Sequence, residues 1–437
     1  MNNVLMGAVR FAQVTIVTLA TLTTLAGCGG GGSSTTNTAG NSPQSTPASP
    51  GATTSSTPSA SAPASAPAAT VPQSTTPNVH PVVVTSTPTQ TRNMLTTSVT
   101  VCVPGTSNCV TIDNVQVDTG SQGLRVLASQ LPASLELPAV PATPPAGTAN
   151  TLNGECSVFG TGFTWGAVRI ADVRMASQLA PGIAIQVIAD PSVPTVPSDC
   201  AASGLPRMTP SALRVNGILG VGLFSADCGG GCITSALPRW YYACDPTGSC
   251  TSTRQPLAQQ VANPISQFAL DNNGIVLDLP AVGPNGAATL NGSMIFGIGT
   301  QANNTLGNAT VLKANTTSGY VTTSLNGQPY SQSFFDSGSN GLFFPSATLA
   351  RCGFWWCPAS TQSLTATVTG TNGASASPAF SIANAQTLFA TQNYAFNNLG
   401  GPSNAFDWGL PFFFGRRVYT AIESRLTSAG KGPFYAF

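Results

Sequence analysis

Residues 117–124, with the sequence VDTGSQGL, decide the fold of this chain because they occur twice. The second copy is residues 335–342, with the sequence FDSGSNGL, and the two copies align without a gap. Each copy follows an apolar, strand-like run. The whole chain holds only 14 acidic residues, so two of them in the same setting are hard to assign to chance. Asp118 and Asp336 in the same setting therefore indicate an internal repeat.

The repeated aspartates indicate a pair of carboxylates that could act together in catalysis. Two carboxylates held face to face repel by roughly 5 kcal/mol at about 3 Å and an effective dielectric near 20, so they favour sharing one proton. The ionised group can then act as a base towards water while the neutral group donates to a carbonyl. The alternative is a pair of ordinary Asx-turns. The positions that would orient the pair and permit the tight turn are Thr119, Gly120 and Ser121, and Ser337, Gly338 and Ser339.

Composition excludes several other functions. Only 7% of the residues are charged and the net charge is +1, which argues against nucleic acid as a partner. The one histidine, His80, lies at the edge of a linker, where we expect it to be solvated. Mechanisms built on Ser-His-Asp or Cys-His, and catalytic zinc sites rich in histidine, therefore lack their ligand or base. No phosphate-binding glycine motif occurs, so we expect neither metal nor cofactor.

The N-terminal segment is typical of an exported protein. Residues 1–27 carry Arg10 ahead of an apolar stretch that is too short for a membrane span. They end in LAGC, which resembles the bacterial lipobox and predicts lipidation of Cys28; Gly29 after it resembles outer-membrane sorting. An ordinary signal peptide with a chance cysteine is the alternative. Residues 28–78, uncharged and rich in Gly, Ser, Thr, Pro and Ala, are predicted to be a disordered tether.

Ten cysteines remain once Cys28 is set aside, an even number that fits a disulfide framework in an exported chain. Four pairs are close in sequence, which leaves one distant pair, although spacing alone does not prove connectivity. The expected bridges are Cys102–Cys109, Cys228–Cys232, Cys244–Cys250, Cys352–Cys357 and Cys156–Cys200.

The body of the chain is expected to be mostly β, with a few short helices. Residues 99–112 predict a hairpin around a PGTSN turn. Further strands are expected over residues 167–175, 183–188, 274–279, 293–296 and 320–325, and short helices over residues 346–351 and 417–426.

With these features in place, the chain resembles the pepsin-like aspartic peptidases over roughly residues 95–437. That family carries DTGS or DSGS in each lobe, as residues 118–121 and 336–339 do here. It also has an apolar-apolar-Gly segment behind each motif, which residues 215–222 and, more loosely, residues 408–412 resemble. The resemblance implies a bilobal fold, with an N-terminal lobe over residues 79–285 and a C-terminal lobe over residues 286–437. Asp118 and Asp336 would be the catalytic pair.

The same resemblance implies a flap over the substrate, with departures. The flap would be Phe159, Gly160, Thr161 and Gly162. Phe159 stands where the family usually has a tyrosine, and Arg125 stands where it has the tryptophan that bonds that tyrosine. We therefore expect a monomeric, envelope-anchored aspartic endopeptidase that takes a peptide or protein substrate in the interlobe cleft. The alternatives are a catalytically silent protein that binds a peptide or an envelope partner in the same cleft, and an envelope assembly protein.

Overall fold

The computed structural model describes residue 71 and residues 75–142, 151–160 and 162–437. The predicted signal peptide, Cys28 and most of the predicted tether lie outside these residues, as does Thr161. The described chain is mostly β, as the sequence predicts. Asn78, the last residue of the predicted tether, is buried against the body, where its side-chain amide donates to the Phe296 carbonyl at 2.7 Å.

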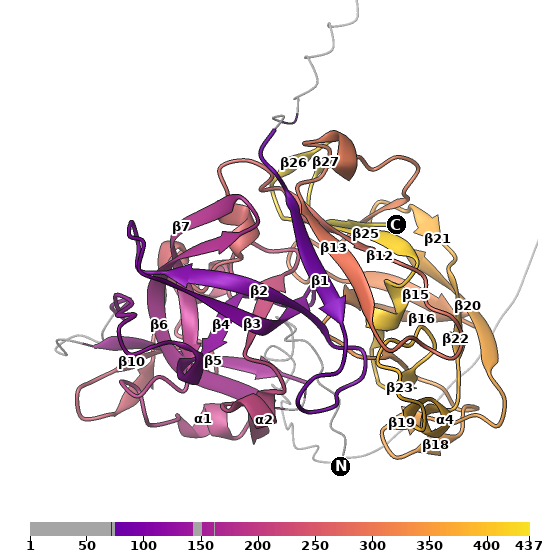
Figure 1. Ribbon diagram of the computed structural model, residues 1–437, viewed down its shortest axis with the longest axis horizontal. Coiled ribbons are helices and arrows are strands. Elements are labelled where there is room, and N and C mark those ends of the chain that lie inside the picture. The colour runs from indigo at the N-terminus through magenta and orange to yellow at the C-terminus, as the bar shows by residue number, and fades with distance from the viewer. Residues whose placement is uncertain (1–70, 72–74, 143–150, 161) are drawn as a thin grey trace, which may run out of the picture. The chain divides into compact units, whose positions relative to one another are not determined.

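The larger sheet joins strands from both halves of the chain, and β1 of the first half pairs along its length with β13 of the second (Figure 1). Its strands are, in spatial order, β11 (Cys250–Ser252), β10 (Tyr241–Cys244), β5 (Leu152–Phe159), β6 (Gly162–Met175), β7 (Gln178–Ile188), β4 (Gln122–Leu127), β9 (Gly217–Val221), β3 (Cys109–Asp118), β2 (Leu95–Cys102), β1 (Val79–Val84), β13 (Leu290–Phe296), β12 (Gly274–Leu279), β25 (Arg416–Ala421), β28 (Phe434–Ala436) and β14 (Val311–Lys313), with β8 (Leu205–Pro206) beside β6.

A second sheet lies entirely in the C-terminal half. Its strands are, in spatial order, β21 (Ser375–Ala376), β20 (Gln362–Thr369), β15 (Val321–Leu325), β16 (Gln328–Asp336), β24 (Phe406–Gly409), β17 (Leu342–Phe344) and β23 (Gly400–Pro402), with β22 (Ala379–Ile382) beside β20. Two short hairpins pair β18 (Arg351–Cys352) with β19 (Trp355–Trp356), and β26 (Leu426–Thr427) with β27 (Gly430–Lys431).

The same strand arrangement occurs once in each sheet. β9 runs parallel to β3 and antiparallel to β4, and β24 runs parallel to β16 and antiparallel to β17. The repeated motif therefore occupies the turn between the first two strands of each unit. This duplication is the plan expected of a bilobal pepsin-like fold, and it is visible in the strand pairing itself.

Every helix in the described residues is short. The α-helices are α1 (Ser198–Ala201), α2 (Pro210–Leu213), α3 (Gly230–Thr234) and α4 (Ala385–Phe389). The 3-10 helices are η1 (Ala128–Gln130), η2 (Leu257–Gln259), η3 (Pro264–Gln267), η4 (Ala302–Asn304) and η5 (Leu410–Phe412). None of these has the length and apolar character that crossing a membrane requires.

The predicted strands are present, but the two predicted helices are wrong. Residues 417–426 begin in β25, which is held between β12 and β28 and buries its last four residues, 418–421. Residues 347–349 form bends and Arg351 begins β18. Oγ of Ser346 accepts from the amides of Thr348 and Leu349 and so offers the backbone a local alternative to a helix.

The solvated position expected for His80 is also wrong. His80 lies in β1 and is 6% exposed. Its Nε2 lies 2.9 Å from the Ser98 carbonyl, and the Ala176 amide donates to its Nδ1 at 3.1 Å. Burial lowers the pKa of His80, so the ring is a neutral, structural member of β1, which lies between β2 and β13 inside the sheet.

All five predicted disulfides are present. The Cys102–Cys109 bridge closes the predicted hairpin, because the two residues face each other at the ends of β2 and β3. The Cys156–Cys200 bridge spans 44 residues and ties α1 to β5.

Candidate active site

The two motif aspartates end equivalent strands. Asp118 is the last residue of β3 and Asp336 the last of β16, and they are 1% and 0% exposed. Gly220 of β9 lies opposite Asp118 as Gly409 of β24 lies opposite Asp336. A Cβ on either glycine would fall within 2.6 Å of the neighbouring backbone, so the close approach of these strands needs glycine.

The residues after the aspartates tie the two loops together. The Thr119 hydroxyl donates to the Phe335 carbonyl at 3.0 Å and accepts from the Ser337 amide at 2.9 Å. The Ser337 hydroxyl mirrors it, donating to the Val117 carbonyl at 2.8 Å and accepting from the Thr119 amide at 3.1 Å. Each loop therefore completes the hydrogen bonding of the other, which fixes the two aspartates relative to one another.

Each carboxyl group is also held within its own loop, by the glycine amide on one oxygen and the serine hydroxyl on the other. The distances are 2.8 Å from Gly120 N and 2.5 Å from Ser121 Oγ to Asp118, and 2.7 Å from Gly338 N and 2.8 Å from Ser339 Oγ to Asp336. The six predicted supporting residues are thus all brought to the pair.

The two carboxyl groups face each other across the loops. A Cβ on Gly338 would lie 2.6 Å from Oδ1 of Asp118 and 3.0 Å from Oδ1 of Asp336. Burial raises the pKa of Asp118 well above its ordinary value, and Asp336 raises it further through its charge and a side-chain hydrogen bond. This is the electrostatic condition for two carboxyls to hold one proton between them.

A narrow cleft opens beside the first motif loop. It is lined by Thr119, Gly120, Gln122, Leu223, Phe224, Ser318, Gly319, Tyr320, Phe334 and Tyr435. Its volume of about 20 Å³ is close to that of a single water, which needs on the order of 10–15 Å³ by the same measure. This space is too small for a peptide side chain.

The predicted flap is a hairpin, but its aromatic residue faces away from water. Phe159 pairs with Gly162 at the ends of β5 and β6, with Gly160 in the turn between them. The Phe159 side chain is 5% exposed and packs in an apolar cluster with Leu127 and Ile218. A Cβ on Gly162 would lie 2.1 Å from the Leu205 carbonyl, so β8 closely supports the hairpin.

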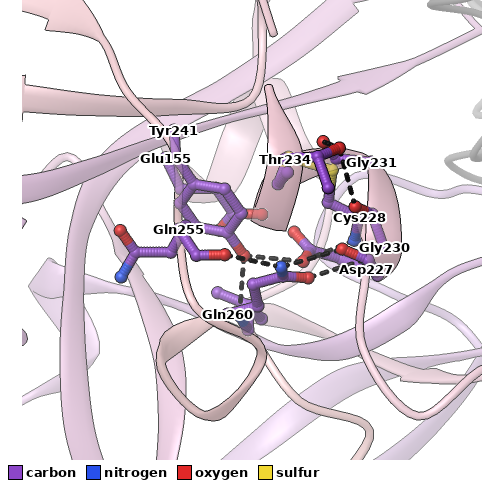
Figure 2. The surroundings of a disulfide bond; sticks show 12 residues. Glu155, Asp227, Cys228, Gly230, Gly231, Thr234, Tyr241, Gln255 and Gln260 are labelled. Atoms are coloured by element: carbon purple, nitrogen blue, oxygen red, sulfur yellow. Dashed lines mark hydrogen bonds between the residues drawn. A yellow bond between two sulfur atoms is a disulfide. The ribbon is translucent and has the colours of Figure 1, made fainter. Parts of the chain in front are cut away.

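Arg125 has exchanged the expected aromatic contact for a buried ion network. Its Nη2 lies 2.5 Å from Oε1 of Glu155 on β5 and 3.2 Å from Oδ2 of Asp227. The Tyr241 hydroxyl donates to Oδ1 of Asp227 at 2.6 Å, and Figure 2 shows Glu155, Asp227 and Tyr241 near the disulfide of Cys228. Burial raises the pKa of Glu155 well above its usual range, although the Arg125 charge opposes the shift. The network links β5, which leads into the predicted flap, to β4, the strand that follows the first motif.

The described residues contain no group of His, Cys, Asp and Glu arranged to hold a metal ion. The ten cysteines of the described ranges are used in bridges, and the His80 ring nitrogens are used in hydrogen bonds to the backbone.

Comparison with known proteins places the chain in a family. The family model described as "Protein of unknown function (DUF3443)" matches residues 74–437. The chain belongs to this DUF3443 family. No curated protein matches its sequence. Among solved structures, the aspartic proteinase from Irpex lacteus is similar at 15% identity over 82% of this chain and 96% of that chain, with a TM-score of 0.46.

Three acidic residues of this DUF3443 member were missed by the sequence reasoning. Glu155 and Asp227 carry no motif, and their role follows from Arg125, which the family resemblance had already singled out as a departure. Asp407 precedes the Trp408-Gly409 pair that the resemblance used, and it aligns with Ile218 of the first apolar-apolar-Gly segment. Comparing these two positions would have identified it.

Proposed function

We propose that this DUF3443 member is an aspartic endopeptidase whose catalytic pair is Asp118 and Asp336. The observation that carries the proposal is the pair of buried carboxyls on two loops that hydrogen-bond each other, with the pKa of Asp118 raised by burial and by Asp336. A duplicated structural turn would not need two carboxyls packed against each other, because unrelieved repulsion of that kind costs stability.

The chemistry follows from one shared proton. The ionised carboxyl takes a proton from water as the water oxygen attacks the peptide carbonyl carbon, and the neutral carboxyl donates its proton to the carbonyl oxygen. When the tetrahedral intermediate breaks its C–N bond, the first carboxyl returns its proton to the leaving nitrogen. The second carboxyl recovers its proton from the hydroxyl of the intermediate, so the pair regains its starting state.

Substrate entry requires the cleft to open. A Cβ on Gly319 would lie 3.2 Å from both Leu223 and Phe224, which shows how closely the loop before β15 approaches the segment after β9. We expect a peptide or protein substrate to separate these two segments and to lie between the halves of the molecule under the Phe159–Gly162 hairpin.

One observation favours the second candidate, a catalytically silent protein that binds a peptide or an envelope partner. Phe159 has no hydroxyl to offer to a substrate, and Arg125 is engaged by Glu155 and Asp227. Both changes affect the flap and leave the carboxyl pair as it is, so they bear on activity rather than on peptide binding.

We further propose that Cys28 is lipidated and that the tether holds the body at the envelope of a bacterial cell, at its outer membrane. The lipobox-like LAGC sequence and the uncharged segment that follows it support this location. Asn78 gives the tether a fixed point of attachment on the body.

The test is cleavage of a peptide library by the purified protein, from strongly acid to alkaline pH, with products identified by mass spectrometry. Asp118→Asn and Asp336→Asn should remove cleavage, while Asp113→Asn, an exposed carboxylate on the same strand as Asp118, should leave it unchanged. Cleavage that survives in either motif variant would refute the proposal that Asp118 and Asp336 are the catalytic pair. A wild type that cleaves nothing, yet binds a transition-state-like peptide in a manner that depends on both aspartates, would favour the silent binding protein.

A further inference from the structure

A third buried carboxyl lies on the strand behind the second motif. Asp407 belongs to β24, between β16 and β17, and is 1% exposed. It lies opposite Phe334 on one side and Phe343 on the other. Phe334 is two residues before Asp336 and lines the cleft.

The side chain of Asp407 projects towards the same face of the sheet as Phe334. Its neighbours Phe406 and Trp408 point the other way, where their rings lie 4.7 Å apart and Trp408 stacks on Phe335 at 6.0 Å. Side chains alternate between the faces of a sheet, so Asp407 shares the opposite, cleft-lining face with Phe334.

Packing does not require a carboxyl at this position. In the first half of the chain the equivalent residue is Ile218, which lies opposite Gln116 as Asp407 lies opposite Phe334. Ile218 is buried in an apolar cluster. The fold therefore accepts an apolar side chain here, and the acidic one needs another explanation.

The carboxyl group of Asp407 lacks a partner. Neither of its oxygens has a hydrogen-bond donor among the described residues, a state that is costly for a buried polar group and marks a place that a donor can fill. Burial, and after it the charge of Asp336, raise the pKa of Asp407 well above its usual range. The Ser339 hydroxyl acts in the opposite direction on this pKa, but its hydrogen bond goes to Asp336.

We propose that Asp407 is a specificity-determining residue that binds the cationic end of a lysine or arginine side chain next to the scissile bond. The inference rests on the proposed peptidase function and names its substrate class. Basic side chains suit the place, because their aliphatic stems can lie along Phe334 while the charged end pairs with the carboxylate.

Binding of a basic side chain at Asp407 should depend on pH, because it is coupled to the release of a proton. A neutral Asp407 must lose its proton to solvent as the cation arrives, so the preference for a basic side chain should rise with pH. The other titratable groups that act on it are Asp336, Asp118 and Tyr435. A ligand without the cation meets the same three groups, and it therefore serves as the reference.

The experiment uses two non-cleavable peptides, in which a hydroxyethylene unit replaces the scissile bond, with lysine or norleucine beside that unit. The two ligands have similar side-chain stems, and lysine adds the terminal ammonium. Calorimetry on the wild-type protein should show at least about tenfold tighter binding of the lysine peptide, the size expected for a hydrogen bond to a charged group. Asp407→Asn should remove most of that preference, and Asp278→Asn, a partly exposed acidic control, should keep it.

Equal affinity of the wild type for the two peptides, on either side of the replaced bond, would overturn the inference. So would a lysine preference that survives in Asp407→Asn. If that variant does not fold, the wild-type preference must still increase with pH, and a flat profile would count against the proposal. Cleavage without any basic preference would sink this inference alone, whereas failure of the wild type to bind either peptide would remove the proposed function as well.

Discussion

Arg125 and Glu155 form a buried ion pair, with 2.5 Å between Nη2 and Oε1 and neither side chain more than 2% exposed. The pair connects the strand after the first motif to the flap strand. It stands where the resemblance to the pepsin-like family predicts an aromatic contact, so the β5–β6 hairpin is joined to β4 by an ion pair instead.

Removing the cation of this pair should be strongly destabilising. Arg125→Met leaves Glu155 and Asp227 buried without their partner, and we expect a loss of about 3–5 kcal/mol in the free energy of unfolding. The triple change Arg125→Met, Glu155→Gln and Asp227→Asn should recover much of it, since no charge then stays uncompensated. Denaturant unfolding measures both, with the exposed Arg174→Met as control. A single variant as stable as wild type would show that the network carries no such energy.

The two motif aspartates should behave as one unit. Asp118→Asn and Asp336→Asn should each lower peptide cleavage by roughly 10⁴-fold or more, and the double variant should lose little beyond either single one. Neither carboxyl alone can share the proton or serve both as base and as acid. Kinetics of the four proteins on one cleaved peptide provide the comparison. A double variant whose loss of activity equals the product of the two single losses would contradict a shared-proton mechanism.

Asp407→Asn should change the pH dependence of stability. The folded-state pKa of Asp407 is raised, so the folded protein binds more protons than the unfolded chain above the ordinary carboxyl pKa of about 4. Its contribution to stability is therefore lost as pH rises through the folded pKa. Relative to wild type, the variant should gain stability between about pH 5 and about pH 8. Denaturant unfolding of both proteins at the two pH values measures this change. A variant that loses stability relative to wild type between these pH values would contradict the prediction.

The longest disulfide loop should contribute most to stability. Replacing Cys156 and Cys200 by alanine opens a separation of 44 residues and should cost about 4 kcal/mol by the loop-entropy model. The matched change at Cys244 and Cys250, with a separation of 6, should cost about 2 kcal/mol. Thiol labelling of the denatured, unreduced body should find no free cysteine, because its ten cysteines form five bridges. Labelling at other positions would speak against the bridges.

Cys28 should carry lipid in the mature protein. Intact-mass analysis should show an N-terminus at Cys28 with the added mass of acyl chains, and Cys28→Ala should release the protein from membranes. The body should unfold as before, because the substitution lies 51 positions before the first described strand, β1 (Val79–Val84). An unmodified N-terminus at another residue would contradict the lipobox.

The sequence alone was sufficient for several features. Two gapless copies of the Asp-Thr/Ser-Gly-Ser motif identified the pair and its supporting residues, because the tight turn and the hydrogen bonds to the carboxyl are local and depend on residue type. Cysteine count and order predicted the five bridges without proving their connectivity, and the structure confirms all five. Local patterns failed at residues 417–426, where pairing with β12 and β28 overrides a helix-compatible sequence. They also failed at His80, which is buried on β1 between β2 and β13.

Only the tertiary structure decided what the pair is surrounded by. Arg125 lies on β4, Glu155 on β5 and Asp227 in the loop before α3, so no local pattern in the sequence relates them. Asp407 reads as one acidic residue in an apolar segment until parallel pairing with β16 sets it opposite Phe334 and buries both its oxygens without a donor. The pKa shifts of these carboxyl groups depend on burial and on the distances between charges. Both are set only when strands that are far apart in the sequence pack together.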